Sequence, residues 1–355
     1  MQYRRTSALL ALLFICILVT ACSKTQDEPI YRNQIFAFGT IVELTLFNTN
    51  DETGDRLSSE IRLMMEEFHH HWHAWQNGPL TELNNALSDT KNKAKQYSVS
   101  TEDAKLINQA LTLAKASDAL FNPTLGKLIA LWGFHKDEPN TAPPSAQQIA
   151  DTLNSLPSLE DISIGNNTIS NNGDKPIHFD FGGFAKGVII DRTIRFLRQS
   201  GVENAIVNAG GDLRAIGSAG NRPWRIGIRH PRDLGVFASL TIDNDEAVFT
   251  SGDYERYFEH NGQRYHHIID PRSGYPANTI ASVTVVHNDG ATADAAATAL
   301  FIAGKQHWPR IAKSMGIEHV MIIDKENKVE ITAKLAQRME YEVTPPPNIE
   351  IRHLP

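Results

Sequence analysis

The sequence predicts an α+β fold, with mixed or antiparallel sheets, flanking helices and two closely joined lobes. Helical hydrophobic spacing dominates the first half of the chain, whereas short alternating strands between glycine turns dominate the region after Ala205. A loop rich in proline, asparagine and threonine, Asp137 to Ala146, is a candidate lobe boundary. With 355 residues, 41% of them hydrophobic, the chain is long enough to bury such a core.

The N-terminal segment is predicted to be a targeting signal outside the fold. Two arginines precede an apolar run from Ala8 to Val19, which is too short for a comfortable membrane span. The run leads to Cys22 in a sequence that resembles the bacterial lipoprotein signal; a chance cysteine after an ordinary signal peptide is the alternative. We expect residues 1–21 to be removed, Cys22 to carry a lipid anchor that includes palmitate, and residues 22–31 to form a tether.

Such a signal predicts the bacterial periplasm as the location. Ser23 follows the acceptor cysteine where an aspartate would favour inner-membrane retention, so the outer membrane is slightly favoured and the inner membrane stays an alternative. The other cysteine, Cys16, lies in the removed segment, so no disulfide is expected. A net charge of -7 argues against nucleic acid as a partner. An anionic ligand would need local positive charge from a helix N-terminus or a metal ion.

Patterns in the first half predict elements with buried apolar faces. Ile35 to Phe47 alternates and is predicted as a strand with a glycine break at Gly39. Helices are predicted over three stretches: Asp55 to Trp72, Ser100 to about Ser117, and Leu125 to Trp132. The first helix runs into a histidine-rich patch, residues 69–73. Consecutive helical residues point in different directions, so a surface patch is favoured over a dedicated metal site.

The chain is organised around Asp180-Phe181-Gly182-Gly183-Phe184-Ala185-Lys186-Gly187. An apolar strand, Ile177 to Phe179, is predicted before this turn, and a helix after it that stops at Ser200-Gly201. A helix N-terminus beside glycines offers unpaired N–H groups and the positive end of the helix dipole, which suits a phosphate or pyrophosphate. Lys186 adds a mobile positive charge. The alternative is a tight strand-to-helix turn with a surface lysine.

The second half predicts a sheet with carboxylates at its turns. The predicted strands are Ala205 to Asn208, Trp224 to Arg229, Ala238 to Ile242, Ser282 to Val286 and His319 to Ile323. The glycine turns at 209–212 and 250–253 each end in an aspartate. Residues 293–300 are predicted as an alanine-rich helix, and residues 341–355 as a proline-rich tail.

Two groups of residues carry specific chemistry. Asp294 and Thr298 are four apart on the predicted helix, so a carboxylate and a hydroxyl face the same way, as suits Mg²⁺; a surface pair is the alternative. His267, Asp270 and Arg272 could supply a proton acceptor, its orienting partner and a phosphate clamp. The alternative is a structural turn in which the histidine caps backbone groups.

Together, these features predict chemistry on a pyrophosphate. The sequence contains neither G-x-x-x-x-G-K-[ST] nor G-x-G-x-x-G, which argues against a P-loop nucleotidase and a Rossmann oxidoreductase. It also lacks the G-x-S-x-G elbow, so a serine hydrolase of that type is not expected.

Five ordered motifs then give a resemblance. These are the turn at 180–187, Asn208-Ala209-Gly210-Gly211-Asp212, Thr250-Ser251-Gly252-Asp253-Tyr254, the run from His267 to Gly274, and Ala293-Asp294-Ala295-Ala296-Ala297-Thr298-Ala299. In order and spacing they resemble the ApbE family, the FAD:protein FMN transferases. The similarity covers about Ile35 to Ala336, within an expected transferase domain at 32–340.

The resemblance implies Mg²⁺-dependent transfer of the FMN part of FAD to a threonine or serine hydroxyl, with release of AMP. The acceptors would be exported flavoproteins of redox-pump or similar type. Carried over by position, Asp294, Thr298 and the carbonyl of Gly183 would bind Mg²⁺, and His267, with Asp270, would be catalytic. The implied contacts to FAD are Phe38, Trp75, Ala119, Leu120, Phe121, Asp180, Lys186, Ile269 and Arg272.

Departures from the family pattern lie in the expected FAD pocket. Phe38 stands where many members have methionine, and Ala119 stands where a glycine is common. The segment after Trp75 matches only loosely. These changes predict altered affinity rather than lost chemistry.

Two other functions remain compatible with the sequence. A periplasmic FAD pyrophosphatase would use water in place of the acceptor hydroxyl and give FMN and AMP. A flavin-binding lipoprotein would carry FAD without turnover, but a carrier needs neither Asp294 and Thr298 as metal ligands nor His267 as a base.

Overall fold

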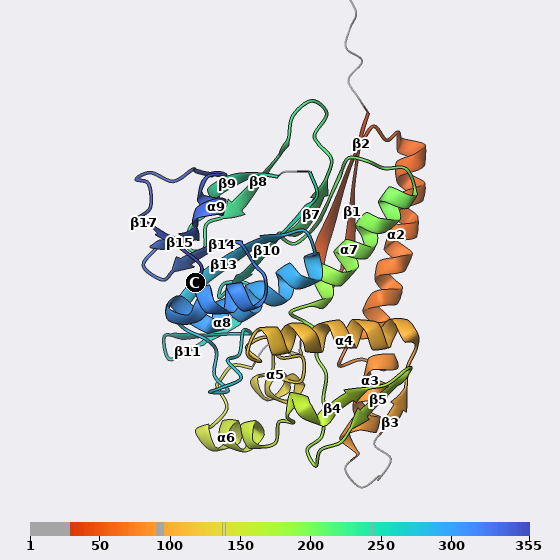
Figure 1. Cartoon of the computed structure of the whole chain (residues 1–355), viewed down its shortest axis with the longest axis vertical. Helices are drawn as coiled ribbons and strands as arrows, with labels where there is room; N and C mark the ends of the chain where they lie inside the picture. Colours follow the sequence, from red (N-terminus) through yellow and green to blue (C-terminus); the bar gives the residue numbers. More distant parts are fainter. Residues whose placement is uncertain (1–28, 90–95, 137, 139, 243) are drawn as a thin grey trace, which may run out of the picture.

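The structure is a computed structural model of the chain and describes residues 29–89, 96–136, 138, 140–242 and 244–355. In this part of the chain, nine strands form one large sheet (Figure 1). In sheet order they are β1 (Ile30–Ala37), β2 (Thr40–Phe47), β6 (Ala205–Ala209), β7 (Asp212–Ile216), β10 (Glu246–Gly252), β13 (Ile280–His287), β14 (His319–Asp324), β15 (Val329–Thr332) and β17 (Ile349–Arg352). The β15–β17 pair is parallel and the other pairs are antiparallel, so the sheet is mixed.

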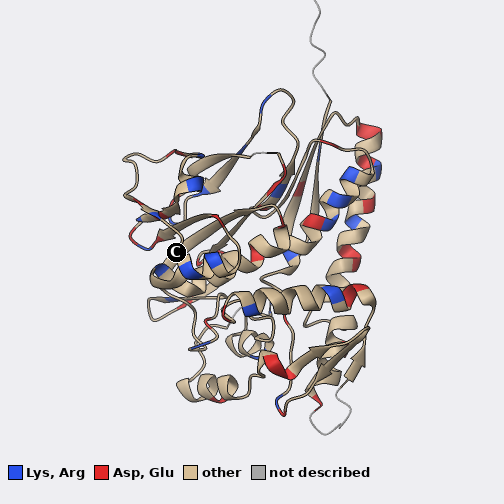
Figure 2. Cartoon of the chain, viewed as in Figure 1, with Lys and Arg blue, Asp and Glu red and all other residues tan. Residues whose placement is uncertain are grey.

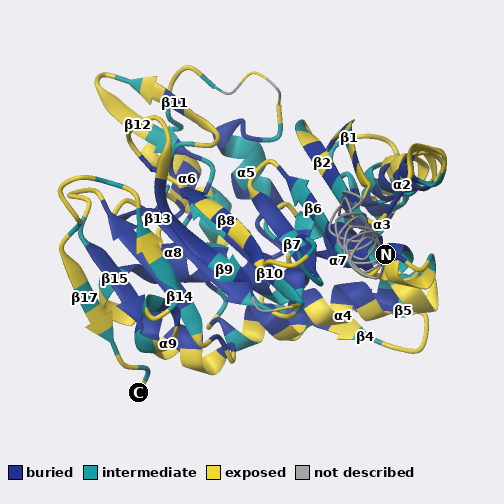
Figure 3. Ribbon diagram, turned by 90° about the horizontal axis from the view of Figure 1, so that it is seen from above, coloured by how far each residue is buried: buried dark blue, intermediate teal, exposed yellow. Residues whose placement is uncertain are grey.

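The two faces of this sheet bury different partners because alternate residues of a strand point to opposite sides. Phe249 and Val285 pack against the helices, whereas their neighbours Val248 and Val286 face a smaller sheet. The helices of the first face are α2 (Asp51–Trp72), α7 (Ala185–Gln199) and α8 (Gly290–Ser314). The smaller sheet consists of β16 (Met339–Tyr341), β9 (Val236–Ile242) and β8 (Trp224–Arg229), with α9 (Ala333–Ala336) nearby. Figure 3 shows the buried strands between these layers.

A second lobe lies below the large sheet in Figure 1. Its helices are α3 (Pro79–Ser88), α4 (Thr101–Ala116), α5 (Gly126–Trp132) and α6 (Ala146–Asn154), with the 3-10 turn Leu159–Asp161. Its strands are β3 (Gln96–Ser98), β5 (Thr168–Asn171) and β4 (Ile162–Ile164), while the hairpin of β11 (Tyr257–His260) and β12 (Gln263–His266) packs against α5. This arrangement confirms the predicted α+β class with flanking helices.

The prediction of one strand from Ile35 to Phe47 is wrong, because this segment belongs to a hairpin of two strands. β1 and β2 pair antiparallel over their whole length, and Phe38 and Gly39 form the two-residue turn with φ of 54° and 70°. Turns with positive φ at both central residues match the twist of the flanking strands. β1 begins at Ile30, within the segment predicted as tether.

Residues 177–179 are not a strand, although the sequence predicted one. This buried segment is held by side chains and a helix end instead of a neighbouring strand. The amide of Asn84 donates to the carbonyl of Phe179 (2.9 Å) and accepts from its N–H (2.7 Å), and the N–H of Gly126 donates to the carbonyl of His178 (3.3 Å). A polar side chain thus replaces the ladder that an apolar run normally needs.

The last part of the chain adds to the sheet. Within the segment predicted as a proline-rich tail, β17 pairs with β15 in register from Ile349↔Val329 to Arg352↔Thr332. The predicted helix at 293–300 is the first half of the longer α8, which is kinked at Gly304 (φ 69°).

The signal, Cys22 and Ser23 lie outside the described residues. Among the residues that are described, each helix is too short or too polar to cross a lipid bilayer. Acidic and basic residues alternate along much of the ribbon in Figure 2.

Ala119 adopts the left-handed conformation, with φ of 58°, directly after Asp118 at 54°. A Cβ makes this region unfavourable by about 1–2 kcal/mol, and glycine avoids that cost while losing more chain entropy on folding. We expect Ala119→Gly to raise the free energy of unfolding by about 0.5–1 kcal/mol, measured by urea denaturation. Ala116→Gly, at the end of α4, is the control and should give no gain. A loss of stability on Ala119→Gly would contradict the strain assigned to this turn.

Candidate functional site

The site begins at the N-terminus of α7, where the glycine turn meets the helix. Asp180 orders the turn, since its Oδ1 accepts from the N–H of Gly182 (2.8 Å) and its N–H donates to the carbonyl of Pro123 (2.8 Å). Phe184, the residue before the helix, is fully buried, so the helix start is fixed in the core. The N–H of Ala185, the first residue of α7, donates to the carbonyl of Phe181 (2.8 Å), so the glycine turn runs directly into the helix.

The N-terminal parts of α7 and α8 lie in close contact. A Cβ added at Gly187 would lie 2.2 Å from the carbonyl oxygen of Gly290, so the two backbones approach each other as only glycine allows. Asp294 on α8 reaches across, and its Oδ2 accepts from the N–H of Gly187 (3.0 Å). One turn further along α8, Thr298 lies against the glycine turn.

The three predicted metal-binding residues therefore meet. A Cβ added at Gly183 would lie 3.0 Å from Oγ1 of Thr298, and Oγ of Ser251 is 3.4 Å from the same atom. Asp294 is 5% exposed. The Asp294 carboxylate, the Thr298 hydroxyl and the backbone carbonyl of Gly183 are hard oxygen donors of the kind that Mg²⁺ takes while keeping positions for water and phosphate. Their role as ligands stays a prediction.

The charges at the site favour a cation. The ammonium group of Lys186 pairs with Asp212, whose other oxygen accepts from the N–H of Thr250 (3.0 Å). Burial alone would lower the pKa of Lys186, but Asp212 and the carboxylates of Asp294 and Glu255 raise it above its ordinary value. Burial raises the pKa of Asp294 and raises the pKa of Glu255 to about 7; Lys186 opposes both shifts, and the neighbouring carboxylates add to them. A divalent cation would favour the charged form of these carboxylates.

His267 is bound to backbone at the end of β12. Its backbone N–H donates to the carbonyl of Arg256 (3.1 Å), and Nδ1 of its ring lies 3.3 Å from the same oxygen. A carbonyl can only accept, so this contact assigns the proton to Nδ1 and the lone pair to Nε2. Burial lowers the pKa of His267 to about 3, so the ring is neutral at physiological pH.

Asp270 does not orient His267, contrary to the prediction. Its carboxylate receives the N–H of Arg272 (2.9 Å) and the Arg272 guanidinium (2.7 Å to Oδ2). Arg272 also donates to the carbonyl of Ile302 (3.1 Å). The residue spacing allowed either pairing, and the turn geometry joins the carboxylate to the arginine two residues on. The backbone of Arg256 takes the orienting contact that was predicted for Asp270.

Two of the predicted FAD contacts are joined directly. Nε1 of Trp75 donates to Oδ2 of Asp180 (3.0 Å), which links the second lobe to the turn before α7. The indole stacks on His178 (4.6 Å between ring centroids, 25°) and lies 4.8 Å from His135. Sequence reasoning missed both histidines, although His178 lies two residues before Asp180.

These two histidines carry unused hydrogen-bonding capacity. Within the described residues, Nδ1 of His135 and Nε2 of His178 are buried and without a hydrogen-bond partner. Burial lowers the pKa of both rings, so both are neutral. Buried polar atoms are normally paired, so these two are candidates for contact with a polar ligand edge.

The other predicted FAD contacts are mostly part of the core. Leu120 is 4% exposed, Phe121 and Ile269 are each 3% exposed, and Phe121 packs against Phe184 beneath the start of α7. Phe38 packs at the hairpin turn against Phe68 and His69. Buried side chains of this kind shape a pocket from behind, and their contact with a ligand stays a prediction.

The histidine patch at the end of α2 is tied to its surroundings. His71 pairs with Asp103 (3.1 Å), and Nδ1 of His73 accepts from the N–H groups of Trp75 (3.1 Å) and Gln76 (3.0 Å). In the described part of the chain, no group of three or more histidine, cysteine, aspartate or glutamate residues could hold a metal ion.

The fold and site define an α+β protein with a candidate ligand site at two adjoining helix N-termini, where a lysine, hard oxygen donors and a neutral histidine lie. The chain belongs to the ApbE family, whose model matches residues 38–321. A curated FAD:protein FMN transferase of Rhodobacter capsulatus is 35% identical over 316 residues, which is 89% of this chain and 60% of the relative. The chain thus spans less than two thirds of that relative's length.

Two further relatives support the assignment to this family. A FAD:protein FMN transferase of Klebsiella pneumoniae is 39% identical over 290 residues, which is 79% of this chain and 84% of the relative. The crystal structure of the ApbE protein of Thermotoga maritima matches with a TM-score of 0.78 and 31% identity, over 87% of this chain and 99% of that chain.

Proposed function

We propose that this protein is a Mg²⁺-dependent FAD:protein FMN transferase. The observation that carries the proposal is the meeting of Asp294, Thr298 and Gly183 beside Lys186 at the α7 N-terminus. A pyrophosphate with a divalent cation fits such a place, since the helix end attracts anions and the acids attract the cation. Relatives that carry the transferase name support the choice of FAD.

In the proposed reaction, the hydroxyl oxygen of an acceptor threonine or serine attacks the FMN-side phosphorus of FAD. A new P–O bond forms to the acceptor, the anhydride P–O bond breaks, and AMP leaves with the bridging oxygen. The hydroxyl proton passes to a base. Nothing is oxidised or reduced. Catalysis of such a step depends mainly on positioning and on charge neutralisation.

Asp294, Thr298 and the carbonyl of Gly183 would hold Mg²⁺, which when bound neutralises charge on the pyrophosphate oxygens. Lys186 lies beside the same helix end and is kept charged by Asp212, so it can bind a phosphate oxygen. His267 presents a neutral ring with Nε2 free of the proton, which suits an acceptor for the hydroxyl hydrogen. Trp75 and Asp180 would contact the FAD from the second lobe.

The proposal extends to where the enzyme works. Its basis is the signal-like segment that leads to Cys22, and the acceptors would be exported flavoproteins. A Cys22→Ser variant is expected to leave the membrane fraction, because it lacks the sulfur that carries the lipid. The measurement is cell fractionation with immunodetection, and undiminished membrane retention of the variant would count against the anchor.

The transfer itself is tested by intact-mass spectrometry together with AMP release. The mixture contains the chain from Ser23, FAD, Mg²⁺ and an exported flavoprotein domain with its threonine, or with Thr→Val as the blank. The expected result is one added FMN per acceptor with equimolar AMP. AMP and free FMN without acceptor modification would support a pyrophosphatase, and unchanged bound FAD would support a carrier.

An Asp294→Asn variant tests the metal assignment in the same assay. The ion would lose its anionic protein ligand, so AMP release at fixed Mg²⁺ should fall by at least about 100-fold, beyond the usual effect of changing an outer-shell residue. Asp151→Asn on the exposed side of α6 is the matched control. An unchanged Mg²⁺ response of Asp294→Asn would remove Asp294 from the metal site.

His267→Ala is expected to lower kcat by about 10²–10⁴-fold if the ring accepts the hydroxyl proton. His353→Ala, an exposed histidine near the C-terminus, is the control. NMR titration provides a second measurement: because the folded-state pKa is lowered to about 3, the ring should stay neutral as pH falls from 8 to about 4. A full-rate variant would make His267 a structural residue, and protonation near pH 6.5 would contradict the lowered pKa assigned to the buried ring.

A further inference from the structure

The contact between α7 and α8 is reciprocal. On α7, Gly187 is followed four residues later by Asp191; on α8, Gly290 is followed four residues later by Asp294. Asp294 accepts from the N–H of Gly187 (3.0 Å), and Asp191 accepts from the N–H of Gly290 (2.8 Å) and of Ala291 (3.3 Å). Each helix thus satisfies first-turn N–H groups of the other, which no residue of their own helix can bond.

The geometry leaves little freedom at this contact. A Cβ at Gly187 would lie 2.2 Å from the carbonyl oxygen of Gly290, and a Cβ at Gly290 would lie 2.7 Å from Oδ1 of Asp191. The glycines let the helices touch, and the aspartates fix how far one helix slides along the other. We call this arrangement of Gly187, Asp191, Gly290 and Asp294 the helix clasp.

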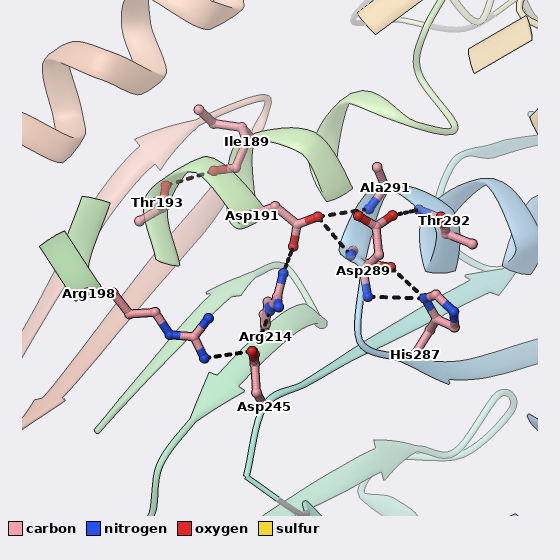
Figure 4. Close-up of polar contacts among 11 residues, drawn as sticks. Ile189, Asp191, Thr193, Arg198, Arg214, Asp245, His287, Asp289, Ala291 and Thr292 are labelled. Carbon is pink, nitrogen blue, oxygen red and sulfur yellow. Dashed lines mark hydrogen bonds and ion pairs between the residues drawn. The ribbon is translucent and has the colours of Figure 1, made fainter. Parts of the chain in front are cut away.

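The two carboxylates of the clasp have different surroundings. Asp191 pairs with the guanidinium of Arg214 on β7, and Arg214 also donates to Asp245 (2.9 Å), which receives Arg198 (2.6 Å) (Figure 4). Asp191 and Arg214 have side chains only 9% and 12% exposed. Asp294, in contrast, shares its surroundings with Lys186 and two further acids.

We propose that Asp191 is a positioning residue that, held by Arg214, sets the register of α8 against α7 and so places Asp294 and Thr298 for the divalent cation. Arg214 pairs with Asp191, whereas Asp294 is left to bind the ion. The two aspartates therefore differ in role although they occupy matching positions on their helices. This inference rests on the proposed function for the identity of the ligand.

The consequence for the site follows from the spacing along α8. Asp294 and Thr298 lie one and two turns beyond Gly290, so a slide of α8 displaces both side chains together relative to Gly183. A displacement near 1 Å at a reacting centre can cost about 100-fold in rate. Residues that orient metal ligands typically contribute 10–100-fold to metal affinity.

The test uses the full chain in detergent, with an Asp191→Asn variant and two measurements that need no FAD turnover. Mn²⁺ binding is measured by EPR of the free ion, and exchange of the Gly187 N–H is measured by hydrogen–deuterium exchange. Asp191→Asn is expected to weaken Mn²⁺ binding by about 10–100-fold and to speed exchange at Gly187, although Asp191 does not touch that group. Arg214→Lys should change both in the same direction, but less.

Asp289→Asn is the matched control. Asp289 caps the same end of α8 from within its own helix, accepting from the N–H of Thr292 (2.8 Å), and asparagine caps equally well. It should leave Mn²⁺ binding and Gly187 exchange unchanged. Faster exchange confined to Gly290 and Ala291 in Asp191→Asn, with unchanged Mn²⁺ affinity, would reduce Asp191 to a local cap and overturn the inference. If Asp191→Asn changes Mn²⁺ binding and Gly187 exchange as expected but the unmodified chain does not transfer FMN, the proposed function is wrong and the positioning role of Asp191 stands.

Discussion

The site depends on two helices whose first turns meet backbone to backbone at Gly187 and Gly290. Unpaired N–H groups at a helix start are costly to bury, and here each helix supplies an aspartate to the other. The large sheet makes the contact possible, because α7 packs on β6 and β7 while α8 packs on β10 and β13. The same contact brings the oxygen of Thr298 to the glycine turn at Gly183.

Charge at the site follows from this geometry. The clasp buries two carboxylates, and Asp191 is the one that pairs with an arginine, Arg214, which it shares with Asp245. Burial raises the pKa of Asp294, and Asp212 and Glu255 add to the shift while Lys186 opposes it, so a further positive charge would favour its ionised form. A divalent cation bound by Asp294 would supply that charge. An anion such as pyrophosphate can approach the helix ends once that cation balances the acids.

Local patterns in the sequence predict much of this structure, and the failures have physical causes. Helical spacing predicts α4 and α7 closely, and the four-residue interval predicts that Asp294 and Thr298 share a face, because both depend only on neighbours along one helix. The hairpin at Phe38 was missed because a positive-φ turn with only one glycine gives a weak signal. The pairing of Asp270 with Arg272 depends on the geometry of one turn, and that of Asp191 with Gly290 on tertiary placement, and residue spacing determines neither.

The division between constrained and variable parts of the site follows from the same contacts. At the clasp an added methyl group meets backbone within 2.2 Å, and neither helix can move without exposing unpaired N–H groups or a buried charge. Phe38, one of the departures in the expected FAD pocket, sits at the β1–β2 turn and packs against Phe68 of α2, whereas the turn at Ala119 is tied to α8 by the ion pair of Asp118 with Arg310 (2.6 Å). A change at Phe38 can therefore alter the expected pocket wall while the geometry of the oxygen donors is held by the packing of two helices on one sheet.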